Sequence, residues 1–253
     1  MFPAFSKARA ETVGISPMPL RDHFQPPLSR SHPWRAFHGA WAAAMARGLN
    51  AGVLPAGYYA VPFLDRDGPV EIDVAAVREP AFPSIDGAAV LWFPPEPEWT
   101  VAVDWPPEDE IRVEILTDDG DPQIAAAIEI VSPSNKDRPQ SRDAFTAKCA
   151  DYLRRGCGLV VIDAVSTRRA DLAADLRSAL GIPGATEPTG SLSAVSYRAV
   201  GHNGNGRLLA WPAPLEIGRS LPTVPLWLGG ELSVPLDLEV SYTDCCTDLR
   251  IRG

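Results

Sequence analysis

Apolar residues recur at helical spacing in the first part of the chain. Between Pro33 and Leu49 they lie three or four positions apart, and Pro33 suits the first position of a helix. These apolar residues are Trp34, Phe37, Trp41, Met45 and Leu49. The spacing predicts a helix over residues 33–49 with one buried face. His38 lies beside that face, which favours a packed or hydrogen-bonded histidine over a ligand.

Strand patterns follow this helix. Tyr58–Leu64 and Val70–Val77 flank the turn sequence DRDG, and Asp73 lies inside the second of these runs. Residues 111–116 and 124–131 flank the sequence DDGDP, and they predict an antiparallel hairpin.

A helix and a buried strand come next. The inner face of the helix consists of Phe145, Lys148, Cys149 and Tyr152. Gly156 suits the end of this helix. Leu159–Val165 is a continuous apolar run, which is typical of a strand buried on both faces. Asp163 near its end is expected to cap a turn.

The remaining third of the chain also contains both helical and strand patterns. Arg168–Leu180 predicts a second helix, and residues 194–200 and 207–211 flank HNGNG in a predicted hairpin. Residues 222–253 predict short strands and a helical turn near Tyr242.

The order of these elements predicts one α/β domain over residues 31–253. It consists of a mixed β-sheet flanked by helices, with an added C-terminal hairpin region. Residues 1–30 lack a clear period and predict an irregular N-terminal arm.

Composition narrows the class of protein. The chain has 253 residues, 45% hydrophobic content and a net charge of -9, so its surface does not suit a protein that coats nucleic acid. Local clustering of basic residues still leaves room for a basic cleft that contacts nucleic acid. The cluster comprises Arg138, Arg142, Lys148, Arg154 and Arg155.

The sequence also allows expectations about the cellular location of the protein and the redox state of its cysteines. No apolar run reaches the roughly 20 residues of a membrane span, and the N-terminal sequence has no signal-peptide pattern. We therefore expect a cytoplasmic protein that does not bind membranes. The four cysteines lack metal-ligand spacing, and they are expected to be reduced thiols. The oligomeric state is not specified.

Charged residues in apolar elements identify the candidate chemistry. Glu129 interrupts an apolar strand, and Lys148 interrupts the apolar face of the following helix. The carboxylates of Asp73 and Glu129 and a backbone carbonyl near Ile130 could hold Mg²⁺ or Mn²⁺ for phosphodiester hydrolysis. Lys148 would be the cation that orients the attacking water. The alternative is a structural ion pair between Glu129 and Lys148.

The loop after the Glu129 strand has two interpretations. Its turn-forming residues could cap the strand end and begin the next helix. Its backbone amides and polar side chains could also bind a phosphate near the same site. The residues concerned are Ser132, Ser134, Asn135 and Lys136.

Several segments resemble one uncharacterised bacterial family, catalogued as domain of unknown function number four thousand and fifty-eight. They are IEIVSPSNK with the lysine-bearing helix and GLVVIDAV, HPWRAFHGAWAAAMARGLNAGVLPAGYYA, and LPTVPLWLGGELSVPLDLEVSYTD. The resemblance covers most of the chain from about Ser31 onward. It implies no established activity.

The core segment is also similar to the Uma-type restriction endonucleases of the PD-(D/E)XK superfamily. This resemblance implies a restriction-endonuclease-like core at about residues 58–165, with Asp73, Glu129 and Lys148 as the site. Ile72 stands where that pattern has proline, and Val131 stands where it has lysine. Lys148 would then supply the cation from the helix, with Glu114 as a fallback carboxylate.

Three functions are consistent with these observations. The first is a metal-dependent nuclease, whose activity requires Glu129 and Lys148. The second is a catalytically inactive protein of the same fold that acts in binding or as a scaffold. The third is a small-molecule-binding domain that uses Trp92, Trp99 and Trp105.

Overall fold

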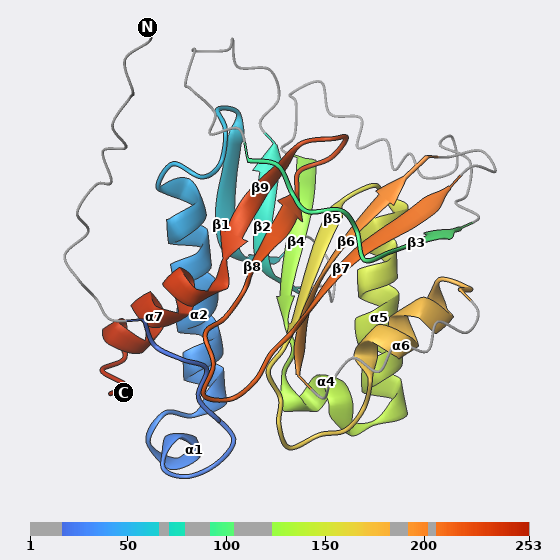
Figure 1. The fold of residues 1–253 in the computed structure, drawn as a ribbon. Helices are drawn as coiled ribbons and strands as arrows, with labels where there is room; N and C mark the ends of the chain where they lie inside the picture. Colours follow the sequence, from blue (N-terminus) through green and yellow to red (C-terminus); the bar gives the residue numbers. More distant parts are fainter. Residues whose placement is uncertain are drawn as a thin grey trace, which may run out of the picture.

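The computed structural model describes residues 17–65, 71–78, 92–103, 123–182, 192–201 and 206–252. Within them, seven strands form one mixed sheet in the order β1-β2-β4-β5-β6-β7-β3, and β8 and β9 form a second, two-stranded sheet (Figure 1). Helices cover both faces of the large sheet, so the predicted α/β class with a mixed sheet flanked by helices is confirmed.

The bounds of the elements are as follows. The strands are β1 (Tyr58–Asp65), β2 (Glu71–Arg78), β3 (Trp99–Ala102), β4 (Gln123–Ile130), β5 (Gly158–Asp163), β6 (Ser193–Val200), β7 (Arg207–Pro214), β8 (Thr223–Trp227) and β9 (Ser233–Asp237). The helices are α1 (Leu28–Ser31), α2 (Trp34–Asn50), α4 (Pro133–Asp137), α5 (Pro139–Arg154), α6 (Leu172–Ala179) and α7 (Leu238–Asp248).

Strand β4 lies near the middle of the large sheet. It pairs antiparallel with β2 and parallel with β5, and the helices α4 and α5 connect it to β5. The other pairings among the described strands are antiparallel, including the predicted hairpin of β6 and β7. Residues 111–116, the predicted hairpin partner of β4, lie outside the described residues. The two neighbours that the structure describes for β4 are β2 and β5.

Two hydrophobic cores lie on opposite faces of the sheet. Helices α2 and α7 and the β8–β9 sheet cover one face, where Ile128 and Ile130 of β4 are buried. Helices α5 and α6 cover the other, where Ala127 of β4 and the following Val131 are buried. Because successive side chains of a strand point to opposite faces, β4 contributes to both cores.

The first core contains the predicted apolar face of α2. Phe37, Trp41, Met45 and Leu49 are all buried there. The Trp41 indole donates a hydrogen bond to the Ser241 hydroxyl on α7 at 3.2 Å. α2 therefore has a fixed position against α7 and the sheet.

The C-terminal helix is longer than the turn expected near Tyr242. Asp237 caps α7 by accepting a hydrogen bond from the Val240 N–H, and the helix packs along α2. Residues 17–27 of the predicted arm have no helix or strand, but Leu20 is buried and the Arg21 N–H donates to the Tyr242 hydroxyl.

Local capping explains two shifted boundaries. α6 begins at Leu172 rather than Arg168, because the Asp171 carboxylate accepts from the Ala174 N–H and caps the helix there. β5 ends at Asp163, whose side chain accepts from the Val165 N–H at 3.1 Å and turns the chain, as expected. β3 was not expected; it is an edge strand paired with β7.

Two simple expectations can be compared with the structure. All four cysteines are buried and free of disulfides, which agrees with the reduced thiols predicted from their spacing. None of the described helices is long and apolar enough to cross a membrane.

The contact between β5 and β8 depends on Gly158. A Cβ at this position would overlap the backbone carbonyl of Trp227. We expect Gly158→Ala to lower the free energy of unfolding by about 1–3 kcal/mol, measured by urea denaturation, because neither backbone can move without disturbing a core. Gly48→Ala is the matched control: its Cβ would meet nothing within 4 Å, and the better helix propensity of alanine should raise stability by about 0.5–1 kcal/mol. Equal stability of the two variants would contradict this account.

Candidate functional site

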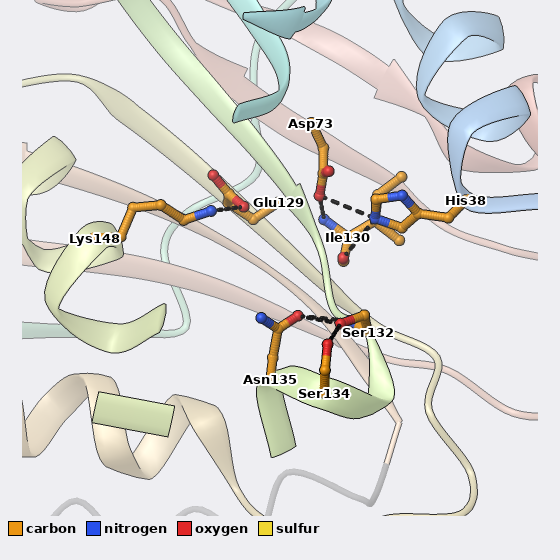
Figure 2. A network of polar contacts seen from close by, with 8 residues as sticks. All are labelled: His38, Asp73, Glu129, Ile130, Ser132, Ser134, Asn135 and Lys148. Carbon is orange, nitrogen blue, oxygen red and sulfur yellow. Dashed lines mark hydrogen bonds and ion pairs between the residues drawn. The ribbon is translucent and has the colours of Figure 1, made fainter. Parts of the chain in front are cut away.

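Glu129 and Lys148 form a close ion pair between the sheet and α5. The Lys148 ammonium donates to Glu129 Oε2 at 2.6 Å, and the side chains are 18% and 2% exposed respectively. Figure 2 shows the two side chains pointing toward one another from α5 and β4. The structure thus brings together the two charged residues that interrupt apolar patterns in the sequence.

Asp73 lies where the described pairing of β2 with β4 ends. Val74 opposite Ile128 is the last pair of this ladder, and beyond it the Ile130 N–H donates to Asp73 Oδ2 at 2.7 Å. A side-chain carboxylate therefore takes the place of a main-chain acceptor. Asp73 is buried and lies on the strand next to the one that carries Glu129.

His38 of α2 completes this arrangement. Its Nε2 lies 3.2 Å from Asp73 Oδ2 and 3.0 Å from the carbonyl oxygen of Ile130 (Figure 2). The hydrogen-bonded role expected for His38 is confirmed, but its position beside Asp73 was missed. The only signal in the sequence was a polar residue at the edge of an apolar helix face.

The two acids and His38 influence one another electrostatically. Burial raises the pKa of the Glu129 carboxyl to about 8, against the opposing effect of Lys148, and the charge of Asp73 raises it further. Burial alone would lower the pKa of His38, but the hydrogen bond and charge of Asp73 and the Ile130 carbonyl raise it above its ordinary value.

Two polar atoms on the α5 side of the site lack a hydrogen-bond partner among the described residues. They are Glu129 Oε1 and the Tyr152 hydroxyl, and both are buried. Burial, followed by the charge of Glu129, raises the pKa of Tyr152, so these groups lie within electrostatic reach of each other. A buried carboxylate oxygen without a partner is costly, and such atoms commonly mark a place for water, an ion or a ligand.

A second buried pair provides an internal comparison. Lys136 donates to Asp163 Oδ2 at 2.6 Å, and Asp163 Oδ1 accepts from the Val165 N–H. Both oxygens of Asp163 are therefore satisfied within the protein. Glu129 has an equally short bond to a lysine, but its second oxygen has no such partner.

The polar loop after β4 forms a helix cap. The Ser132 N–H and hydroxyl both donate to the Asn135 side-chain oxygen at 2.8 Å, and Ser132 begins α4 in a capping box. The Ser134 hydroxyl lies 2.6 Å from that of Ser132, and Lys136 is buried against Asp163. The structure shows the capping role; phosphate binding by this loop stays a prediction.

The donor set fits a hard divalent cation only in part. No group of three His, Cys, Asp or Glu side chains in the described parts of the chain is placed to hold a metal ion. The available oxygens are those of Asp73, Glu129 and the Ile130 carbonyl. Two carboxylates with water and substrate oxygens are the usual environment of Mg²⁺, so the Glu129 oxygen that lacks a hydrogen-bond partner among the described residues suits such an ion. The fallback Glu114 lies outside the described residues.

Comparison with known proteins adds no further assignment. No protein-family model, no curated protein and no solved structure matches this chain. The arguments below therefore depend on the geometry of the site and on its chemistry.

The raised pKa of Glu129 predicts a pH-dependent stability. A carboxyl with a pKa of about 8 instead of its ordinary 4.5 binds more protons in the folded state than in the unfolded chain. The free energy of unfolding therefore falls between these two pH values, by at most about 1.4 kcal/mol per pH unit for one proton. We expect Glu129→Gln, which cannot ionise, to gain stability relative to the natural protein between pH 5 and pH 8 in urea denaturation.

An exposed carboxylate provides the control for this experiment. Glu216 is 73% exposed beside Arg219, so Glu216→Gln should give a stability curve parallel to that of the natural protein. If the Glu129→Gln curve is parallel as well, burial does not perturb Glu129 as described.

Proposed function

We propose that the protein is a phosphodiesterase that cleaves nucleic acid with a divalent cation, on a restriction-endonuclease-like core. Asp73, Glu129 and the Ile130 carbonyl would hold Mg²⁺ or Mn²⁺. The observation that carries the proposal is the buried Glu129 Oε1, which has no hydrogen-bond partner among the described residues, in a carboxylate that bonds Lys148 and lies within electrostatic reach of Asp73. A structural ion pair does not account for it, since the Lys136–Asp163 pair leaves neither carboxylate oxygen unsatisfied.

The positions of the two acids support the nuclease-like core. Asp73 directly precedes Val74 and Glu129 directly follows Ile128, and these two residues pair between antiparallel neighbours. The carboxylates thus come from separate strands at one level of the sheet. Lys148 reaches this level from α5, and it supplies the cation that the strand lacks because Val131 occupies the corresponding position.

Each side chain has a distinct task in such a reaction. A bound divalent cation lowers the pKa of water and offsets negative charge on the phosphate. The Ile130 N–H holds the Asp73 carboxylate in one orientation. Lys148 bonds Glu129, and in the proposed reaction the charge of its ammonium group would stabilise the negative charge that develops on the phosphate.

A catalytically inactive binding or scaffold protein is the second candidate. The observation that favours it is the position of His38 Nε2, within 3.0 Å and 3.2 Å of two of the oxygens required for the ion. A protonated His38 would balance the Asp73 carboxylate with no metal. Arg142 and Arg155 of the predicted basic cleft are also paired with acids of the same chain.

Cleavage assays with matched variants test the proposal. We expect the full chain to cut single- or double-stranded DNA or RNA with Mn²⁺ or Mg²⁺, and EDTA to abolish cutting. Asp73→Asn, Glu129→Gln and Lys148→Met should each lower the rate by about 100-fold or more, because each removes a charge that acts on the reacting phosphate.

Two variants at exposed ion pairs control for general effects. Arg47→Gln on α2 and Asp151→Asn on α5 change charges on the same helices but away from the site, and they should retain the natural rate. Absence of metal-dependent cleavage and of metal-binding heat in the natural protein would favour the inactive candidate. Cleavage that persists in Glu129→Gln would contradict the site assignment.

A further inference from the structure

We propose that a cavity between α2, α7 and the β8–β9 sheet binds a small organic cation that has an apolar body. The cavity has a volume of about 470 Å³, which lies in the range of small-molecule sites. Its apolar lining belongs to the core beneath α2 and α7, whereas Lys148 approaches Glu129 from α5 on the opposite face of the sheet. The cavity is therefore a separate site from the one proposed above.

A space of this size is not an ordinary packing defect. Protein interiors are close-packed, and their voids seldom exceed the size of a water molecule. The buried side chains of Met45, Leu49 and Leu236 line the inner part of the cavity. Val240 lines it as well and is 55% exposed. Apolar surface of this kind gains free energy when it leaves water, so it suits a ligand with an apolar body.

Gly48 of α2 leaves room for such a ligand. It lines the cavity, and a Cβ at this position would meet nothing within 4 Å. A larger side chain here would extend into the cavity. Because glycine is unfavourable inside a helix, the space that it keeps open is consistent with a binding role.

Acidic side chains determine the charge of the ligand. The charged residues of the described lining are Asp237 and Asp244. Arg47 lies 3.9 Å from Asp244, but its nearer partner is Asp248, at 3.2 Å. Three carboxyl groups thus accompany one guanidinium group at this edge of the molecule. This excess of acidic groups favours a cationic ligand.

Trp92 favours the same class of ligand. It lines the cavity and is half-buried, and the face of an indole ring attracts organic cations. The other two tryptophans considered for a small-molecule site do not contribute here. Trp99 packs against Tyr197, with ring centroids 6.3 Å apart, and Trp105 lies outside the described residues.

The cavity walls are already held in place. Ser241 of α7 lines the cavity, and its hydroxyl accepts a hydrogen bond from the Trp41 indole of α2 and donates one to the Leu238 carbonyl at 3.1 Å. These bonds fix α7 against α2, so a ligand does not have to order the two helices. Since the Ser241 hydroxyl is satisfied, the carboxylates are the groups that bind the polar end of the ligand.

Calorimetry with three related probes tests the charge preference on the full chain. Phenylbutylamine is a cation at neutral pH, phenylbutanol is uncharged and phenylbutyrate is an anion. We expect saturable binding of the amine, about fivefold weaker binding of the alcohol and the weakest binding of the anion. Asp244→Asn should weaken amine binding by about threefold and leave alcohol binding unchanged. Asp151→Asn, an exposed acid on α5, is the matched control and should change neither.

Two variants of Gly48 test the location of the site. Gly48→Leu should abolish amine binding because its side chain fills the cavity, whereas Gly48→Ala should retain most of it. Thermal melting checks that each variant is folded. Absence of saturable amine binding, equal binding of the three probes, or full amine binding by Gly48→Leu would overturn the proposal. A dimer in analytical ultracentrifugation that Gly48→Leu dissociates would also overturn it, since a second copy of the chain would then occupy the cavity.

Discussion

The hydrogen bond from the Ile130 N–H to the Asp73 carboxylate is the interaction on which the site depends. A continued ladder would satisfy this N–H with a backbone carbonyl of β2, and Asp73 would be free to turn away. Instead the carboxylate is held beside β4, next to Glu129, whose side chain faces Lys148 of α5. The same bond leaves the Ile130 carbonyl to His38. Because a side-chain carboxylate takes the place of a backbone acceptor, the Asp73 carboxylate, the Ile130 carbonyl and the His38 imidazole lie together.

Burial makes this arrangement chemically significant. An ionised carboxylate away from water is costly unless it is paired and fully hydrogen-bonded. The protein meets that condition at Asp163, where a lysine and a backbone N–H satisfy both oxygens. It does not meet it at Glu129, although Lys148 is equally close. Because both pairs have an equally short lysine–carboxylate contact in the same protein, the difference between them belongs to the site rather than to a general tolerance for buried charge.

The fold was largely predictable because its cores depend on local periodicity. The spacing of apolar residues located α2 and most strands, and two charges in apolar positions located Glu129 and Lys148. Their contact followed from adjacent elements of a strand–helix unit, 19 residues apart. His38 and Ile130 are 92 residues apart, and their contact depends on how α2 crosses the sheet. The spacing of apolar residues does not predict how a helix crosses a sheet, so this contact could not be predicted from the sequence. The length of α7 was underestimated because two Thr, two Cys and one Val among its 11 residues are weak helix formers, and packing on α2 compensates for them.

Charge balance links the occupancy of the site to its chemistry. Burial raises the pKa of Glu129 to about 8, so at neutral pH and without an ion a proton largely neutralises this carboxylate. In the proposed reaction a divalent ion would have to displace this proton, and with both acids ionised and His38 neutral the site would then carry one net positive charge for a singly charged phosphodiester. The whole chain has a net charge of -9, so any attraction for a phosphodiester must come from charges at the site itself. The proton on Glu129 and the proposed ion are therefore alternative ways to neutralise this carboxylate, and only the ion would leave positive charge available for a substrate.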